Sequence, residues 1–147
     1  LAPLAELPGL EEIDLRNNPV ESVAPLAGMA SLNSLILFDS NVSDLTALSA
    51  CPNLTLLDVG GTPIASPAAF QGLSALRTLI LHKSQLQTLQ GIQAFPQLEL
   101  IHLANTPVRD LSPLLELPNL QRVIVSEDMR AAAEALGGNA KFEIEYQ

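Results

Sequence analysis

The sequence predicts a curved α/β solenoid, in which each repeat contributes one strand to a parallel concave sheet of about six strands. Three observations support this prediction. Leucines recur with a fixed period and no insertion or deletion, at Leu10, Leu32, Leu54, Leu76, Leu98 and Leu120. After each of the first five, apolar residues follow at the third, fifth and tenth positions and a small polar residue at the eighth. Aromatic residues make up only 3% of the chain, which suits a thin aliphatic core between stacked units.

A strand opens each repeat, and the rest of the repeat returns over the convex side. In residues 11–16, the alternation of a strand places Ile13 and Leu15 inward and Glu12, Asp14 and Arg16 outward. The returns contain many prolines and glycines, which favour short 3-10 or irregular turns over long helices.

The repeat skeleton matches the leucine-rich repeat pattern, L-x-x-L-x-L-x-x-N/C-x-L. Its clearest copy is residues 98–120, LELIHLANTPVRDLSPLLELPNL, whose DLSPL and LPNL segments resemble the 22-residue repeats of bacterial internalin-like proteins. The resemblance implies a right-handed superhelix. The chain departs from the family at the asparagine position, which only Asn18 keeps. The other repeats carry hydroxyl side chains there, which we expect to bond neighbouring backbone more weakly than an amide: Ser40, Thr62, Ser84 and Thr106.

The N-terminal end is expected to be truncated. Repeats cover residues 1–125, and residues 1–9 have the phase of the outer half of a repeat, with no polar cap ahead of the first strand. Leu4, Leu7 and Leu10 are then expected to form an apolar edge. A second copy could cover this edge and so form a dimer.

Residues 126–147 break the period and are predicted to cap the other end of the same structural domain. Ser126 has the right chemistry to start a helix with an apolar face, and Gly137 and Gly138 are suited to end it. Residues 141–146 then alternate polar and apolar, which predicts a strand with one buried face. We therefore expect a helix–strand cap.

Charge and composition narrow the class of partner. The net charge is −9, and residues 1–60 hold eight acidic side chains against Arg16 alone. This argues against nucleic acid, which needs clustered Lys and Arg, and suits a basic protein partner better. The alternative is that acidity only keeps an apolar-rich chain in solution. No apolar run approaches the ~20 residues of a membrane span.

The outward strand positions form the candidate binding surface. A sheet face turned to water should be polar, yet this one is predicted to carry apolar side chains in neighbouring strands. The alternative is that scattered surface hydrophobes have no function, or that they cover one another in a shallow bowl. The predicted partner-binding residues are Ile36, Phe38, Leu56, Asp58, Ile80, His82, Leu100, His102 and Ile124, with Asp14, Arg16 and Arg122 as rim charges.

Nothing in the sequence predicts an enzyme, a cofactor or a metal site. His82 and His102 are diagonal neighbours on adjacent strands, and Asp58 has the same relation to His82, but no third ligand converges on them. No nucleophile with a paired base and no phosphate-binding loop is present. The single cysteine, Cys51, occupies a core position of its repeat and is predicted to be a buried thiol.

Two functions follow as hypotheses. The first is a protein-recognition module that binds through its concave face. The internalin-like resemblance implies that it belongs to a bacterial surface or secreted protein. The second is an acidic inhibitor or immunity protein that blocks a basic enzyme. The sequence predicts no localisation that separates them.

Overall fold

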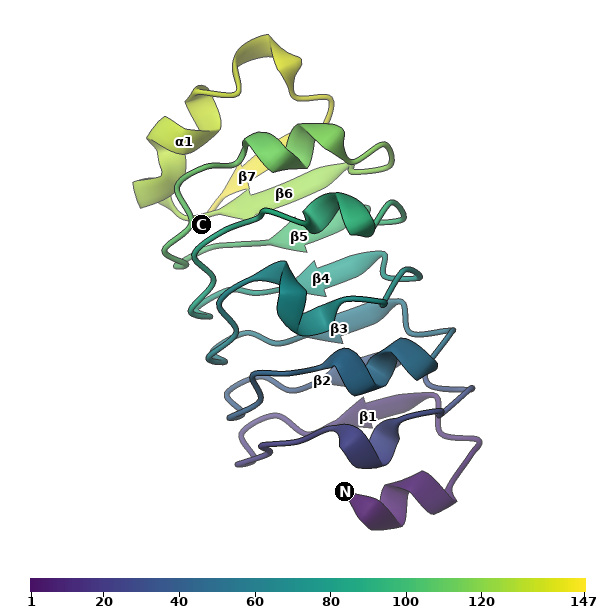
Figure 1. Cartoon of the computed structure of the whole chain (residues 1–147). Helices are drawn as coiled ribbons and strands as arrows, with labels where there is room; N and C mark the ends of the chain where they lie inside the picture. The colour runs from purple at the N-terminus through teal and green to yellow at the C-terminus, as the bar shows by residue number, and fades with distance from the viewer.

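The computed structural model describes all 147 residues and forms a single curved solenoid (Figure 1). Its concave side is a seven-stranded parallel sheet whose strands follow one another in chain order. This confirms the predicted solenoid, and the expected cap strand joins the sheet as its seventh member. The strands are β1 (Glu12–Asp14), β2 (Ser34–Ile36), β3 (Leu56–Asp58), β4 (Thr78–Ile80), β5 (Leu100–His102), β6 (Arg122–Val125) and β7 (Glu143–Tyr146).

The register between the first six strands is constant. Every residue of a strand pairs with the residue at the same place in the next repeat, so one row of inward side chains runs through the sheet. Leu35, Leu57 and Leu79 lie in this row and are fully buried. Because neighbouring rows are filled by the equivalent apolar residues of each return, one continuous hydrophobic core runs the length of the solenoid.

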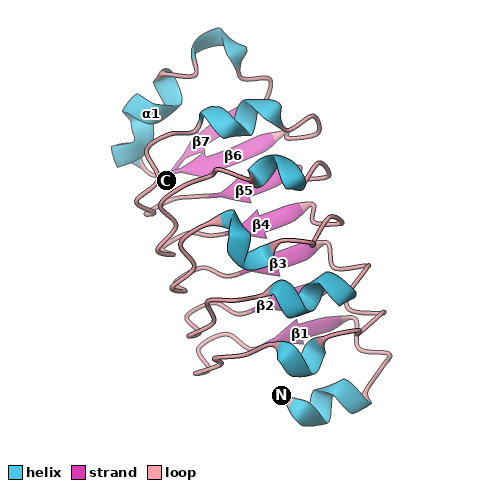
Figure 2. Ribbon diagram, viewed as in Figure 1, coloured by secondary structure: helices cyan, strands magenta, loops and turns pink.

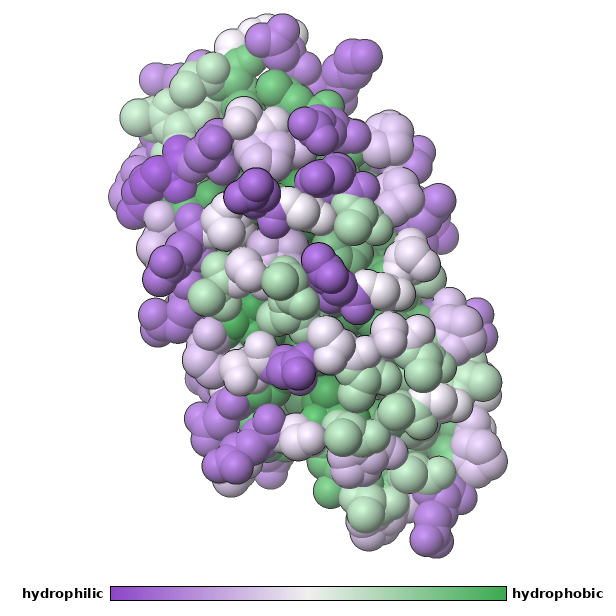
Figure 3. All heavy atoms as spheres, viewed as in Figure 1, coloured by the Kyte–Doolittle hydropathy of each residue, from purple (hydrophilic) through white to green (hydrophobic).

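The convex side is built from short 3-10 turns, as the prolines and glycines predicted (Figure 2). Each of the six repeats contributes one such turn, and the only α-helix, α1 (Arg130–Glu134), belongs to the C-terminal segment. Figure 3 looks onto this side and shows hydrophobic residues gathered over the turns of the first repeats, toward the N-terminal end. The 3-10 turns are Ala2–Glu6, Ala24–Leu26, Thr46–Ala50, Pro67–Phe70, Ile92–Ala94, Ser112–Glu116, Glu127–Met129 and Gly137–Asn139.

A second regular feature follows the strands. The residue three positions after each of the first five strands has a positive φ, between 55° and 68°, in the sequence Asn17, Asp39, Gly61, Lys83 and Asn105. Glycine, asparagine and aspartate tolerate this left-handed conformation, whereas a long side chain is strained in it. The backbone amides of the first four donate to carbonyls of the next repeat at 2.8–3.0 Å, which fixes the conformation. Lys83 is the one residue that does not suit its position.

We therefore expect Lys83→Asn to raise the free energy of unfolding by about 0.5–1 kcal/mol, because the backbone strain is relieved while the amide keeps its bond to the Ala104 carbonyl. Urea titration measures the change. Lys141→Asn removes the same charge at another exposed position and should leave stability nearly unchanged. If both substitutions raised the free energy of unfolding equally, the increase would come from the loss of a positive charge and not from relief of backbone strain.

The hydroxyl residues at the asparagine position behave in two ways. The Thr62 hydroxyl donates to the Val59 carbonyl at 2.6 Å, and the Thr106 hydroxyl donates to the Leu103 carbonyl at 2.7 Å. The hydroxyls of Ser40 and Ser84 are equally buried and have no hydrogen-bond partner. The expectation that all four hydroxyls bond the backbone is therefore confirmed for the threonines and wrong for the serines. The threonine methyl group restricts rotation of the side chain, whereas the serine hydroxyl is free to rotate away from the carbonyl.

This difference predicts opposite results for two conservative substitutions. Thr62→Val keeps the shape but leaves the buried Val59 carbonyl without its donor, so the free energy of unfolding should fall by about 1–3 kcal/mol. Ser84→Ala removes a buried hydroxyl that has no partner, and it should leave stability unchanged or raise it. Chemical denaturation of both variants checks this pair, and a larger loss for Ser84→Ala would contradict it.

The C-terminal segment contains the predicted helix and strand with two corrections. Ser126 precedes the turn Glu127–Met129 but makes no capping hydrogen bond; its hydroxyl instead accepts the Asn105 amide at 2.9 Å. The helix α1 is only five residues long and ends before Gly137, which opens a further 3-10 turn. The Ser126 hydroxyl does not cap the turn because it serves as the acceptor for the Asn105 backbone amide, which needs a partner at the point where the repeats end.

Two further observations complete the fold. Cys51 is buried and its thiol donates to the Leu26 carbonyl at 3.2 Å, which confirms the predicted core thiol. No helix in the structure has the length and apolar character that crossing a membrane would need.

Candidate binding face

The concave face consists of three columns of side chains that run across the strands. The first column is Glu12, Ser34, Leu56, Thr78, Leu100, Arg122 and Glu143, and the second is Asp14, Ile36, Asp58, Ile80, His102, Ile124 and Glu145. The third lies just beyond the strands and contains Arg16, Phe38, Gly60, His82 and Ala104. The predicted binding residues therefore share one face, in the order that the repeat phase gives them.

Three aromatic rings from separate repeats meet at the centre of this face. The rings of Phe38 and His82 are stacked with their centroids 5.1 Å apart, and those of His82 and His102 are stacked at 4.8 Å. The interplanar angles are 13° and 15°, so the three rings are nearly parallel. We call this group the ring ladder. Repeat phase alone placed the histidines as diagonal neighbours and did not predict that their rings would stack.

Gly60 makes the ring ladder possible. Phe38 and His82 follow β2 and β4, which are separated by β3, so their rings can meet only above the residue between them. That residue is Gly60, where a methyl group would lie 2.8 Å from the His82 ring atoms Cε1 and Nδ1 and 2.9 Å from the His82 carbonyl oxygen. The rings therefore occupy the space that any other side chain at position 60 would need.

The aliphatic part of the face is only partly covered. Ile36, Leu56, Ile80 and Leu100 are half-buried, and each lies beside a residue of the next strand in register. Ile124 is different, because only 7% of it is exposed. Its neighbour β7 places Glu145 beside it, and Glu145 forms an ion pair with Arg122. Ile124 therefore has little surface to offer a partner.

The predicted rim charges form ion pairs within the chain. Arg16 pairs with Asp14 at 2.8 Å, and the Arg122 guanidinium pairs with Glu145. Hydrogen bonds from the Arg16 side chain and backbone lower the pKa of the exposed Asp14 carboxyl. Each pair combines one positive and one negative charge, so these rim residues offer a partner less net charge than the sequence suggested. Asp58 has no basic partner within salt-bridge distance, and its carboxylate accepts the Gly60 amide at 3.0 Å.

The imidazole rings of the two histidines are partly shielded from water. His82 Nδ1 and His102 Nε2 are buried and have no hydrogen-bond partner. Burial lowers the pKa of the His102 imidazole, and the neighbouring His82 lowers it further, although Gln147, Asp58 and Glu145 act in the opposite direction. No three His, Cys, Asp or Glu side chains in the structure converge to hold a metal ion.

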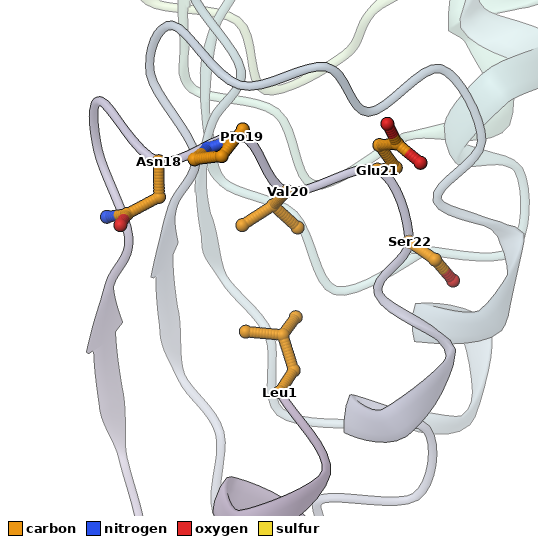
Figure 4. A pocket seen from close by; sticks show the side chains of 6 residues that line it. All are labelled: Leu1, Asn18, Pro19, Val20, Glu21 and Ser22. Atoms are coloured by element: carbon orange, nitrogen blue, oxygen red, sulfur yellow. The ribbon is translucent and has the colours of Figure 1, made fainter.

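Two pockets lie away from the concave face. One is at the N-terminal end, where Leu1 faces the loop of residues 18–22 (Figure 4). The other lies between the last 3-10 turn of the repeats and the C-terminal segment, and Leu115 and Phe142 are among its lining residues. Neither pocket includes a predicted site residue.

No protein-family model matches the sequence, and no curated protein is similar enough to count as a match. Solved structures do match. Internalin C2 of Listeria monocytogenes has a TM-score of 0.80 and 25% identity over 100% of this chain and 66% of its own. An internalin F of the same organism has a TM-score of 0.74 and 23% identity, covering 99% of this chain and 50% of its own.

A leucine-rich repeat protein of Leptospira interrogans gives a third comparison, with a TM-score of 0.77 and 24% identity over 97% of this chain and 38% of its own. The chain thus spans between about two fifths and two thirds of the length of these proteins. The TM-scores of 0.74–0.80 show that the chain shares its overall fold with these structures. The chain therefore has the leucine-rich repeat solenoid fold, and its repeats resemble those of the bacterial internalins.

Proposed function

We propose that the protein is a recognition module that binds another protein through its concave face. The observation that carries this proposal is the chemistry of the face. Its central strands present partly exposed aliphatic side chains and a ring ladder where a sheet turned to water would be polar. The similarity to internalins of Listeria and a leucine-rich repeat protein of Leptospira supports a bacterial origin and a role in protein recognition, on the bacterial surface or after secretion.

The binding surface is centred on the ring ladder and on Leu56, Ile80 and Leu100. These residues come from β3, β4 and β5, so they are held by strands with neighbours on both sides. A rigid, half-buried aromatic group in an apolar surround has the properties of an interface hot spot. Ile124 and the paired charges Asp14, Arg16 and Arg122 lie outside this centre, and we assign them at most a rim contact.

The distribution of charge favours a basic partner. All five arginines are in ion pairs within the chain, and these pairs use five of the sixteen acidic side chains. Eleven acidic side chains therefore keep charges that no salt bridge neutralises, Asp58 at the centre of the face among them. This surplus also supports the second candidate, an inhibitor or immunity protein that blocks a basic enzyme. A strong decrease of the association rate with salt is expected for both.

Replacement of Phe38 tests the proposed surface. Phe38→Ala removes one end of the ring ladder, and affinity for the partner isolated with the intact protein from its native source should fall by at least about 2 kcal/mol. Calorimetry or surface plasmon resonance measures the change.

Gln71→Arg is the matched control, because Gln71 is exposed on the convex side and should be dispensable. If Phe38→Ala binds like the wild type and Gln71→Arg abolishes binding, the functional face is the convex one and the proposal is wrong.

We also propose that the N-terminal edge can pair with a second copy. Leu7 is 50% exposed, and Leu1, Leu4 and Leu10 are only partly buried against the core. The strand β1 has a neighbour on one side only, so its other edge is open. Light scattering over a range of concentrations tests this, and a strict monomer at high concentration would exclude a stable dimer.

A further inference from the structure

The ring ladder brings together the only two histidines of the chain, although they come from different repeats. Their ring centroids are 4.8 Å apart, which is a normal stacking distance for neutral rings. Two protonated imidazoles at this separation repel each other, and little water can enter between stacked rings to screen the charges. The geometry therefore suits a pair of rings that does not hold two protons at once.

Burial of unpaired ring nitrogens also opposes protonation, and the Gln147 side chain is the hydrogen-bonding group that acts in the opposite direction at His102. A neutral imidazole has one nitrogen that carries no proton, and such a nitrogen can be buried without a donor at modest cost. His82 Nδ1 faces Gly60, and both it and His102 Nε2 are buried without a partner. A proton added to a buried ring nitrogen creates an N–H group that needs an acceptor, and leaving such a group unpaired costs more than leaving a lone pair unpaired.

The surrounding charges do not reverse this effect. Asp58 on β3 and Glu145 on β7 both act on His102 and favour its protonated form. Glu145 is already in an ion pair with Arg122, and Asp58 is acted on by Arg16 and accepts the Gly60 amide. Lys83 follows His82 in the chain, Asp39 follows Phe38, and the Arg16–Asp14 pair lies at the end of the same face. Desolvation is the largest influence on the pKa of His102 and lowers it, followed by His82.

We propose that acidification opens the ring ladder and thereby weakens partner binding at the concave face, because a proton on His102 places a charge against the stacked His82 ring in a partly buried site. The part that concerns binding rests on the proposed function of this face. The opening itself does not, since it is a property of the free protein. At neutral pH the ladder is closed and presents an apolar surface; at acid pH it becomes a separated, positively charged pair that also repels a basic partner.

The direction of the stability change follows from the lowered pKa of His102. The unfolded chain binds a proton at this residue near the ordinary histidine pKa of about 6.5, and the folded chain binds it only at a lower pH. Between these two values the unfolded state holds more protons. The folded state is therefore fully favoured above pH about 6.5 and loses stability as the pH falls through the interval, by about tenfold in the unfolding constant for each unit of separation.

An NMR titration of the free protein from pH 8 to pH 5 tests the proposal directly. Because the chain has only two histidines, His82→Gln and His102→Gln assign both imidazole signals. We expect His102 to take up its proton at a pH below the ordinary histidine pKa, with the Phe38 ring signals shifting as the stack opens. A His102 titration near pH 6.5, with no change at Phe38, would overturn the proposal.

A ladder without titratable rings provides the control. In the variant that combines His82→Phe and His102→Phe, the stack keeps three rings but cannot be protonated, so the loss of stability between pH 7.5 and pH 5.5 should largely disappear. The same pH dependence in this variant and the wild type would contradict the proposal. If the titration is as expected but Phe38→Ala leaves partner affinity unchanged, the ladder is proton-sensitive and the binding face has been placed wrongly.

Discussion

Leu79→Ala is expected to lower the free energy of unfolding by about 2–5 kcal/mol, the range for removing a fully buried leucine side chain. Leu79 is 0% exposed and lies on β4 between Leu57 and Ile101 in the inward row of the sheet. The register is constant and each repeat packs against its neighbours, so the cavity cannot be filled without shifting strands on both sides. Urea titration should show a lower midpoint.

The adjacent residue supplies the control for this prediction. Ile80 is similar in size but points to the concave face and is only half-buried, so Ile80→Ala should cost less than about 1 kcal/mol. Equal losses for the two variants would mean that the concave side chains contribute as much to stability as the core. They would then be held as part of the fold and would not be free to serve a partner.

Gly60→Ala should have the second large effect, a loss of about 1–3 kcal/mol in the free energy of unfolding. The new methyl group would lie 2.9 Å from the His82 carbonyl oxygen, and this backbone atom is fixed because it accepts the Gly61 amide. It would also lie 2.8 Å from two atoms of the His82 ring. The ring must therefore move, and the stack with Phe38 should open.

Two measurements separate these consequences of Gly60→Ala. Chemical denaturation reports the loss of stability, and the chemical shifts of Phe38 and His82 report the stack. Gly138→Ala is the matched control, because a methyl group there meets nothing within 4 Å and its φ is not positive. A Gly60→Ala variant as stable as the wild type, with unchanged ring signals, would show that the ladder does not depend on the missing side chain.

Much of this structure could be predicted from the sequence because the repeat fixes phase. Once the leucines are evenly spaced, each residue has an assigned row, which is why Leu79, Cys51 and the outward position of Phe38 were all predicted correctly. The strands, the 3-10 turns and the parallel order follow from the same phase. The period of the repeat predicts the position of each residue along the backbone, and the strands of the structure agree with it.

What could not be predicted depends on how side chains turn from those positions. Phase places His82 and His102 diagonally, but only the absence of a side chain at Gly60 lets the rings lean together. The same applies to Ser40 and Thr62, which share a position but differ in hydrogen bonding. The positive-φ position after each strand was also missed, although the sequence contains a signal for it. Four of the five repeats have Asn, Asp or Gly there, and only one has a lysine, Lys83.

The constant register of the first six strands has a consequence for how this protein can change. Removing or adding one whole repeat returns every later residue to its own row, whereas deleting one residue within a strand would turn outward the inward side chains that follow it in that strand. Length can therefore vary in whole modules. The outward columns, apart from the buried Gly60, Ala104 and Ile124, can meanwhile be rewritten residue by residue. A scaffold of this kind can therefore change its binding specificity through its outward residues while the fold stays the same.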